Sequence, residues 1–218
     1  MKLVEVMDNL QSEGIPSRRK TLLKQGAADD AFGVPMGKIR SFAKDIGKNQ
    51  ELADELWSTG QFDAQNLGIF LMESGKVTLE DALEYLGSAQ TVELSDSLIS
   101  NVLAKIKDEA KLADLCSKNR DLKLRRAYWA LMVANKSQYE ADFPEILEYI
   151  SENLPLSQEP ETWMMNRMLC EIGFGYPNYT EKCLEIGERC GVYKTMKVSK
   201  GCTSAYAPDW IHAVVGRK

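Results

Sequence analysis

An internal match at a spacing of sixty residues places the strongest constraint on the fold of this chain. Residues 121–135, DLKLRRAYWALMVAN, read as one helix that is apolar over much of its circumference and capped by Asp121. Sixty positions earlier, residues 62–73 carry apolar side chains at the matching places, and the tripeptide LAD occurs at both 52–54 and 112–114. Each copy is a short helix, a tight link and a longer apolar helix. Repeated helix pairs stack on their neighbours, so the match predicts an α-solenoid.

The remainder of the chain continues the helical pattern. Helical periodicity with capping or glycine and proline breaks predicts further helices at residues 2–12, 17–26, 36–46, 50–57, 78–86, 94–106, 108–118, 142–150, 161–172, 179–190 and 210–215. Ser17 is the expected cap of the second helix, and Thr78 with Asp81 suggests a capping box. No segment shows sustained alternation of polar and apolar residues. We therefore predict an all-α fold, with residues 1–218 forming a single solenoid domain of stacked antiparallel helix pairs.

Composition excludes several classes of protein. The 218 residues are 44% hydrophobic, which is enough for one good core, and no apolar run is long enough to span a membrane. The N-terminal segment MKLVEVMDNL is amphipathic and acidic, unlike a signal peptide. The five cysteines are odd in number and scattered, so we read them as reduced thiols of a cytoplasmic protein. With one histidine and no GxGxxG or phosphate-binding loop, no metal and no cofactor are predicted.

Charge is distributed in blocks along the chain, although the net charge is only −5. Residues 17–48, 101–126 and 189–218 are basic, whereas residues 49–100 and 137–188 are strongly acidic. In a solenoid such blocks can gather basic segments on one face, and a basic stripe on an acidic protein still binds phosphates. Ordinary solvated helix faces are the alternative.

Several of the predicted long helices also carry polar side chains near their starts: Lys38 and Arg40, Gln65 and Asn66, Arg125 and Arg126, and Asn166 and Arg167. In stacked helix pairs the same helix of each pair lines the concave face. A row of amides and guanidinium groups there can follow a phosphate backbone without reading bases. Arginine suits this task because its planar fork pairs two phosphate oxygens. The alternative is an array of salt bridges to neighbouring acids.

Five blocks of sequence carry a resemblance to a known family. They are FGVPMGKIRSFAKDIG, LADELWSTGQFDAQNLGIFLME, the acid in VELSDSL, the RRAYWALM helix and WMMNRMLCEIGFGYPNY. Together they resemble the DNA alkylation repair family over roughly residues 32–188. The resemblance implies a HEAT-like repeat solenoid, and some members of the family are DNA glycosylases that remove alkylated purines. The terminal GCTSAYAPDWI is similar to the tail of a less studied branch.

The resemblance also assigns site residues. Asp96 takes the place of the catalytic aspartate, but Val92 stands where the glycosylases have a tryptophan four residues earlier. Arg125 or Arg126 takes the place of the arginine that contacts DNA near the lesion. Arg167 stands where a second tryptophan faces the lesion, and the nearest tryptophan, Trp163, is one turn earlier. The acid and the arginine are retained, whereas both aromatic faces are lost or displaced.

These observations lead to one functional prediction and one alternative. The chain is predicted to bind double-stranded DNA as a monomer, and to be a DNA glycosylase if Asp96 stabilises charge on the sugar during hydrolysis. The predicted DNA contacts are Lys38, Arg40, Gln65, Asn66, Arg125, Arg126, Trp163, Arg167, Lys197 and Lys200. The alternative is a non-catalytic HEAT-like module that holds a DNA structure or a protein partner in its concave groove. Valine cannot supply an aromatic face for a cationic base, so DNA binding is better supported than excision.

Overall fold

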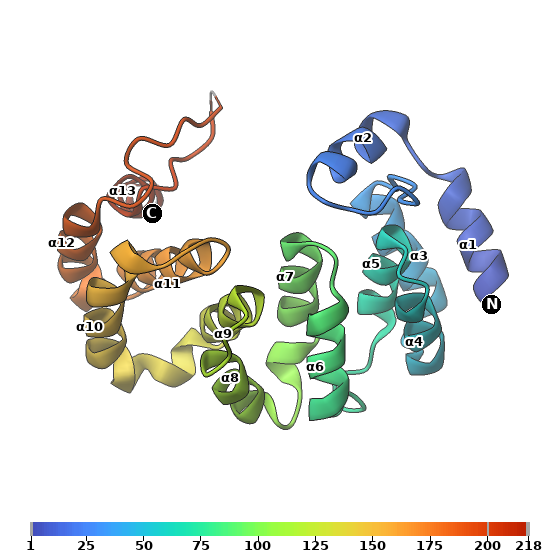
Figure 1. Cartoon of the computed structure of the whole chain (residues 1–218), viewed down its shortest axis with the longest axis horizontal. Helices are drawn as coiled ribbons and strands as arrows, with labels where there is room; N and C mark the ends of the chain where they lie inside the picture. The colour runs from blue at the N-terminus through green and yellow to red at the C-terminus, as the bar shows by residue number, and fades with distance from the viewer. Residues whose placement is uncertain (1, 200, 217–218) are drawn as a thin grey trace. The chain divides into compact units, whose positions relative to one another are not determined.

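The computed structural model describes residues 2–199 and 201–216, and every regular element in those residues is helical (Figure 1). This confirms the predicted all-α class. The chain divides into two compact units, Met1–Leu115 and Cys116–Lys218, which are described separately here. The helix α8 (Glu109–Ser117) crosses from one unit into the other. The prediction that residues 1–218 form one domain stays a prediction. No helix in the described part of the chain is long and apolar enough to cross a membrane.

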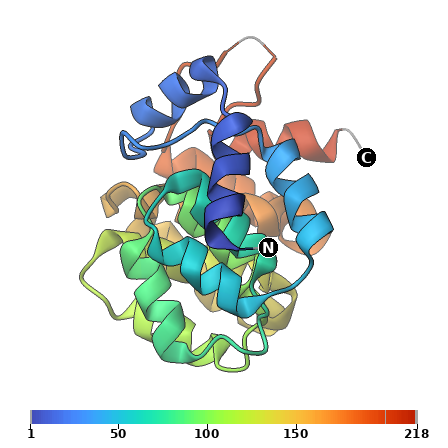
Figure 2. The ribbon, with the colours of Figure 1, turned by 90° about the vertical axis from the view of Figure 1, so that its right-hand side faces the viewer.

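The first unit is built around the helix α5 (Phe62–Leu71), whose residues are almost all buried. It packs against α3 (Met36–Ile46), α4 (Gln50–Ser58) and α7 (Val92–Asn101). The helix α1 (Leu3–Ser12) lies against α4 and α5 and is seen in front of them in Figure 2. The other elements of the unit are α2 (Pro16–Lys24), α6 (Leu79–Ser88) and the short 3-10 helix η1 (Leu103–Lys105).

The second unit is centred on the close packing of α9 (Leu122–Ala134) against α11 (Glu161–Gly175). The helix α10 (Phe143–Asn153) also contacts α11, and α12 (Thr180–Cys190) and α13 (Ala207–Val215) pack on α11 and on each other. The 3-10 helices η2 (Lys136–Asp142), η3 (Leu154–Leu156) and η4 (Pro177–Tyr179) link these elements. Ile211 of α13 is fully buried, so this helix contributes to the core of the unit.

The sixty-residue match is realised in the helix starts. The two long helices begin at Phe62 and Leu122, and the residue before each accepts a hydrogen bond on its side chain. The Gln61 side chain accepts from the backbone N–H of Ala64 at 2.7 Å, and Asp121 accepts from that of Lys123 at 2.8 Å. Both are N-caps that satisfy an otherwise unpaired donor of the first turn.

Other sequence-based boundaries had mixed outcomes. The capping box at Thr78 and Asp81 is confirmed. The prediction that Ser17 caps the second helix is wrong, because Pro16 occupies the first helical position and Ile15 is the N-cap. The predicted helix 94–106 is two pieces, since the backbone of Val102 (φ −127°, ψ −64°) leaves the helical region between α7 and η1. The last helix begins at Ala207, three residues before its predicted start.

A buried carboxylate holds the N-terminal part of the first unit in place. Asp63 is fully buried, and its oxygens accept from the backbone N–H groups of Phe32, Gly33 and Val34 at 2.7, 3.1 and 2.8 Å. The Gln61 side chain donates to the same carboxylate at 3.1 Å. Four donors around one acid satisfy its lone pairs and compensate for its burial.

The turn held by Asp63 in turn carries α2. The Ile15 N–H donates to the carbonyl of Gly33 at 3.1 Å, and the Arg18 Nε donates to that of Val34 at 2.8 Å. Gly33 has φ +81°, and a Cβ there would lie 2.5 Å from the backbone nitrogen of Arg19, so glycine is required. Asp63 thus determines where α2 and its side chains lie.

We expect Asp63→Ala to lower the free energy of unfolding by about 3–5 kcal/mol, because it leaves two buried backbone donors and one partly buried donor without an acceptor. Urea unfolding followed by circular dichroism measures this. Asp45→Ala, at an exposed acid of α3, is the control and should change stability by no more than about 0.5 kcal/mol. Equal stability of the two variants would contradict the anchoring role.

Candidate functional site

The predicted catalytic acid lies on α7, whose start is fixed by Thr91. The Thr91 hydroxyl accepts from the Leu94 N–H at 3.2 Å, so the helix begins at Val92. Asp96 follows Val92 by four residues, which puts the two side chains one turn apart on the same face of the helix. Both are partly exposed. The helix therefore presents a carboxylate beside a small aliphatic side chain, Val92, at the place where the glycosylases that the sequence resembles have a tryptophan.

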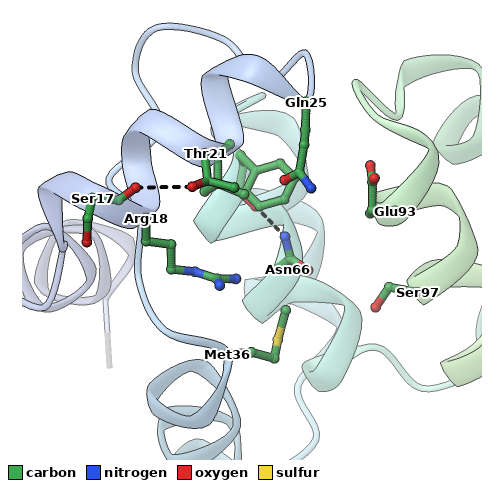
Figure 3. Close-up of a pocket in the computed structure, with 10 residues that line it drawn as sticks. Ser17, Arg18, Thr21, Gln25, Met36, Asn66, Glu93 and Ser97 are labelled. Atoms are coloured by element: carbon green, nitrogen blue, oxygen red, sulfur yellow. Dashed lines mark hydrogen bonds between the residues drawn. The ribbon is translucent and has the colours of Figure 1, made fainter. Parts of the chain in front are cut away.

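A pocket of about 540 Å³ opens beside this helix within the first unit. From α7 it is lined by Glu93 and Ser97, which flank Asp96 in sequence (Figure 3). The facing wall comes from α2 and its C-cap, and the floor from α3 and α5; these contribute Ser17, Arg18, Thr21, Leu22, Gln25, Met36, Phe62 and Asn66. The volume is in the range of small-molecule sites, and charged, amide and apolar groups converge there.

The two amides predicted to contact DNA on α5 are buried instead. Gln65 and Asn66 are 1% and 2% exposed, because α5 is surrounded by α3, α4 and α7. The Gln65 Nε2 donates to the Trp57 carbonyl at 3.2 Å, and the Asn66 Nδ2 donates to the Phe62 carbonyl at 3.0 Å. The position of Gln65 gives no support to its predicted role on an open DNA-binding face. Asn66 remains accessible only through the pocket that it lines.

Arg125 and Arg126 join α9 to the start of α11. The Arg125 Nε and Nη2 donate to the Glu161 Oε1 at 2.9 and 2.8 Å, and Glu161 is 2% exposed. The Trp129 indole N–H donates to the same oxygen at 3.3 Å. Arg126 is 5% exposed and donates to the Pro160 carbonyl at 3.0 Å. Arg125 thus pairs with a neighbouring acid, which is the alternative that the sequence analysis left open.

The two arginines nevertheless differ in accessibility. The Arg125 side chain is 34% exposed and lines two hollows of the second unit, of about 360 and 430 Å³. Tyr128 and Tyr149 also line the first hollow, and Arg120 also lines the second. Arg125 can therefore still meet a ligand while it is paired, whereas Arg126 has a structural position.

Trp163 belongs to an aromatic group on α11 and the C-terminal segment. Its ring centroid lies 5.6 Å from that of Tyr193 and 6.4 Å from that of Trp210 of α13. Arg167 follows one turn later, is 41% exposed, and makes an i,i+4 pair with Glu171 at 3.4 Å. Lys197 is exposed. Lys200, the other lysine predicted in this segment, lies outside the described residues. Trp163 and Arg167 are thus brought together, as their spacing indicates.

The predicted contacts on α3 are also accessible. Lys38 has a side chain that is 53% exposed and pairs with Glu13 at 3.1 Å. Arg40 is exposed, and its guanidinium carbon lies 5.9 Å from the centroid of the Phe70 ring. Neither side chain is enclosed, so both can reach a phosphate.

Two pocket residues, Arg18 and Glu93, escaped the sequence-based prediction. The predicted helix 94–106 begins one residue after Glu93, so the sequence analysis did not place Glu93 on the helix that carries Asp96. No signal existed for Arg18, whose place depends on the Asp63-bound turn far along the chain.

Comparisons with known proteins agree with the family resemblance of the sequence. A family model described as DNA alkylation repair enzyme matches residues 6–204. A solved structure described as "A new family of proteins related to the HEAT-like repeat DNA glycosylases with affinity for branched DNA structures" is similar with a TM-score of 0.86 and 25% sequence identity. The match covers 100% of this chain and 95% of that one. No curated protein matches this chain.

Removing the acid shared by Arg125 and Trp129 should destabilise the second unit. We expect Glu161→Ala to cost about 2–3 kcal/mol, below the value for a fully buried pair because Arg125 is partly exposed to water. Denaturant unfolding followed by tryptophan fluorescence measures the loss. Glu145→Ala is the control, since Glu145 lines the same hollow but is exposed. An unchanged midpoint for Glu161→Ala would show that the link between α9 and α11 is unimportant.

Proposed function

Because the chain belongs to the DNA alkylation repair enzyme family, we propose that it is a DNA-binding protein that favours branched DNA structures. The observation that carries this proposal is the similarity, over the whole chain, to a structure described by its affinity for branched DNA. A TM-score of 0.86 at 25% identity is support from both fold and sequence for a shared mode of binding.

The exposed cations supply the chemistry for backbone binding. Four cations are accessible: Lys38 and Arg40 in the first unit, and Arg167 and Lys197 in the second. The acids that pair with Lys38 and Arg167 are themselves partly exposed. Surface cations of this kind neutralise phosphates and release counterions without reading sequence. Arg126 is left out of the proposed contact set because its burial assigns it to the packing of α9 on α11.

Base excision is the second candidate function, and Asp96 is the observation that favours it. A cationic alkylpurine leaves with little acid catalysis, so a carboxylate that stabilises the developing charge on the sugar is the main requirement. Asp96 carries such a carboxylate and is partly exposed on α7. Lesion selection is the weaker part, because Val92 and Arg167 occupy the places of the aromatic residues. DNA binding therefore comes first and excision second.

The binding proposal is tested by titrating a four-way junction and a linear duplex of the same strands. We expect tighter binding of the junction. The double substitution Arg167→Ala with Lys197→Ala should weaken binding for unrelated sequences alike and reduce the slope of log affinity against log salt by roughly one to two. The control, Lys111→Ala with Lys182→Ala, removes two positive charges from exposed i,i+3 pairs on α8 and α12.

Equal affinity for junction and duplex would remove the preference for branched DNA. Absence of binding to either, by protein that remains folded, would remove the DNA proposal and favour a module that binds a protein partner.

The excision candidate is tested with methylated duplex DNA. If Asp96 is the catalytic residue, purified protein releases alkylated purine, and Asp96→Asn loses on the order of ten- to a thousandfold of that rate while still binding DNA. Val92→Trp restores an aromatic face one turn away and should raise excision. No release by the wild type or by Val92→Trp would exclude the glycosylase function.

A further inference from the structure

The pocket between α2 and α7 is lined by a positively charged side chain, Arg18, and a negatively charged one, Glu93. The Arg18 Nε is occupied by the Val34 carbonyl at 2.8 Å, which fixes the guanidinium in place. Within the described part of the chain, the two terminal NH2 groups of Arg18 have no partner, and neither has the Glu93 carboxylate. Figure 3 shows Arg18 reaching from α2 into the pocket and Glu93 on its opposite side.

A third group, Asn66, is almost completely enclosed and yet unsatisfied. Its Nδ2 donates to the Phe62 carbonyl, and the residue is 2% exposed. Its Oδ1 accepts no hydrogen bond from any residue that the structure describes. This oxygen keeps some contact with solvent, so from the wall of the pocket it can accept a hydrogen bond from a ligand.

The opposed charges restrict what the pocket can hold. A phosphate would be repelled by Glu93, and a simple cation by Arg18. A neutral, flat ligand with an acceptor edge and a donor edge satisfies both sides at once. Leu22, Met36 and Phe62 add apolar surface for the face of a ring.

We infer that this pocket binds the base of an unpaired guanine. The O6 and N7 atoms of guanine accept from the forked N–H groups of an arginine, the commonest specific contact between proteins and DNA bases. Its N1–H and N2 amino group donate to carboxylate and amide oxygens, which Glu93 and Asn66 offer. Adenine fails on both edges, because its N6 amino group would face Arg18 and its N1 acceptor would face Glu93.

In duplex DNA the donor edge of guanine is occupied by cytosine, so only an unpaired base can enter. Unpaired bases arise at branch points and in single strands, and enzymes that read a flipped base use the same combination of edge contacts and apolar surface. In its DNA form this inference rests on the proposed function. A free guanine nucleotide presents the same base, and the test separates the two sources.

The test measures binding of junctions that carry one unpaired nucleotide at the branch point: guanine, adenine, deoxyinosine or 7-deazaguanine. The wild type should bind the guanine junction about tenfold more tightly than the adenine junction, the effect of one good bidentate contact. Deoxyinosine lacks the N2 amino group and 7-deazaguanine lacks N7, so each should weaken binding several-fold. Titration with deoxyguanosine and deoxyadenosine monophosphates repeats the comparison without DNA structure.

Two substitutions assign the effect to the pocket. In Glu93→Gln the penalty for deoxyinosine should shrink, because an amide oxygen is a weaker acceptor than a carboxylate. In Arg18→Lys, which keeps the charge but loses the fork, the preference for guanine over adenine should fall. Glu80→Gln is the matched control, because Glu80 and Glu93 are both the second residue of a helix capped by threonine. It should behave as the wild type. Thermal unfolding confirms that the variants are folded.

The outcomes separate this inference from the proposed function. Junction binding that is equal for all bases overturns the guanine pocket and leaves DNA binding intact. Discrimination between the two mononucleotides, with no binding to DNA, supports the pocket and overturns the DNA proposal. Failure of both assays overturns both. A deoxyinosine penalty of unchanged size in Glu93→Gln overturns the assignment of the base to this pocket.

Discussion

The capture of one turn by the buried carboxylate of Asp63 underlies the architecture of the first unit. A loop that enters a helical core exposes backbone donors that no helix can satisfy, and Asp63 accepts three of them from residues 32–34. The same turn offers the Val34 carbonyl to Arg18 and the Gly33 carbonyl to Ile15. A single acid on the central helix therefore positions α2, and with it one wall of the pocket beside α7.

The second unit solves a similar problem with a different residue. Glu161 opens α11, where an acid is favoured by the helix dipole, and it collects the guanidinium of Arg125 and the indole of Trp129 from α9. In both units a buried acid on one element fixes the next, and polar side chains that resemble ligand contacts in the sequence serve the packing. We propose that binding depends on the exposed cations and on the pocket residues Arg18 and Glu93.

Features set by short-range chemistry were predictable from the sequence. Asp121 caps its helix and Thr78 forms a capping box, because capping depends on residues two or three positions apart. The two long helices were found from their helical periodicity and their match at sixty residues. The site was harder to predict. Gln65 and Arg126 lie in helices whose surroundings come from distant segments, so their burial is invisible in the sequence. Arg18 reaches the pocket only through a turn held thirty residues away.

We propose that DNA contacts exposed cations of each unit, Lys38 on α3 in the first and Lys197 in the second. Lysine acetylation read by mass spectrometry, with and without saturating junction DNA, tests this most directly. The account predicts protection of Lys38 and Lys197, with Lys111 and Lys182 modified at the same rate in both conditions. Protection of Lys111 and Lys182 in place of Lys38 and Lys197, or no protection anywhere, would contradict it.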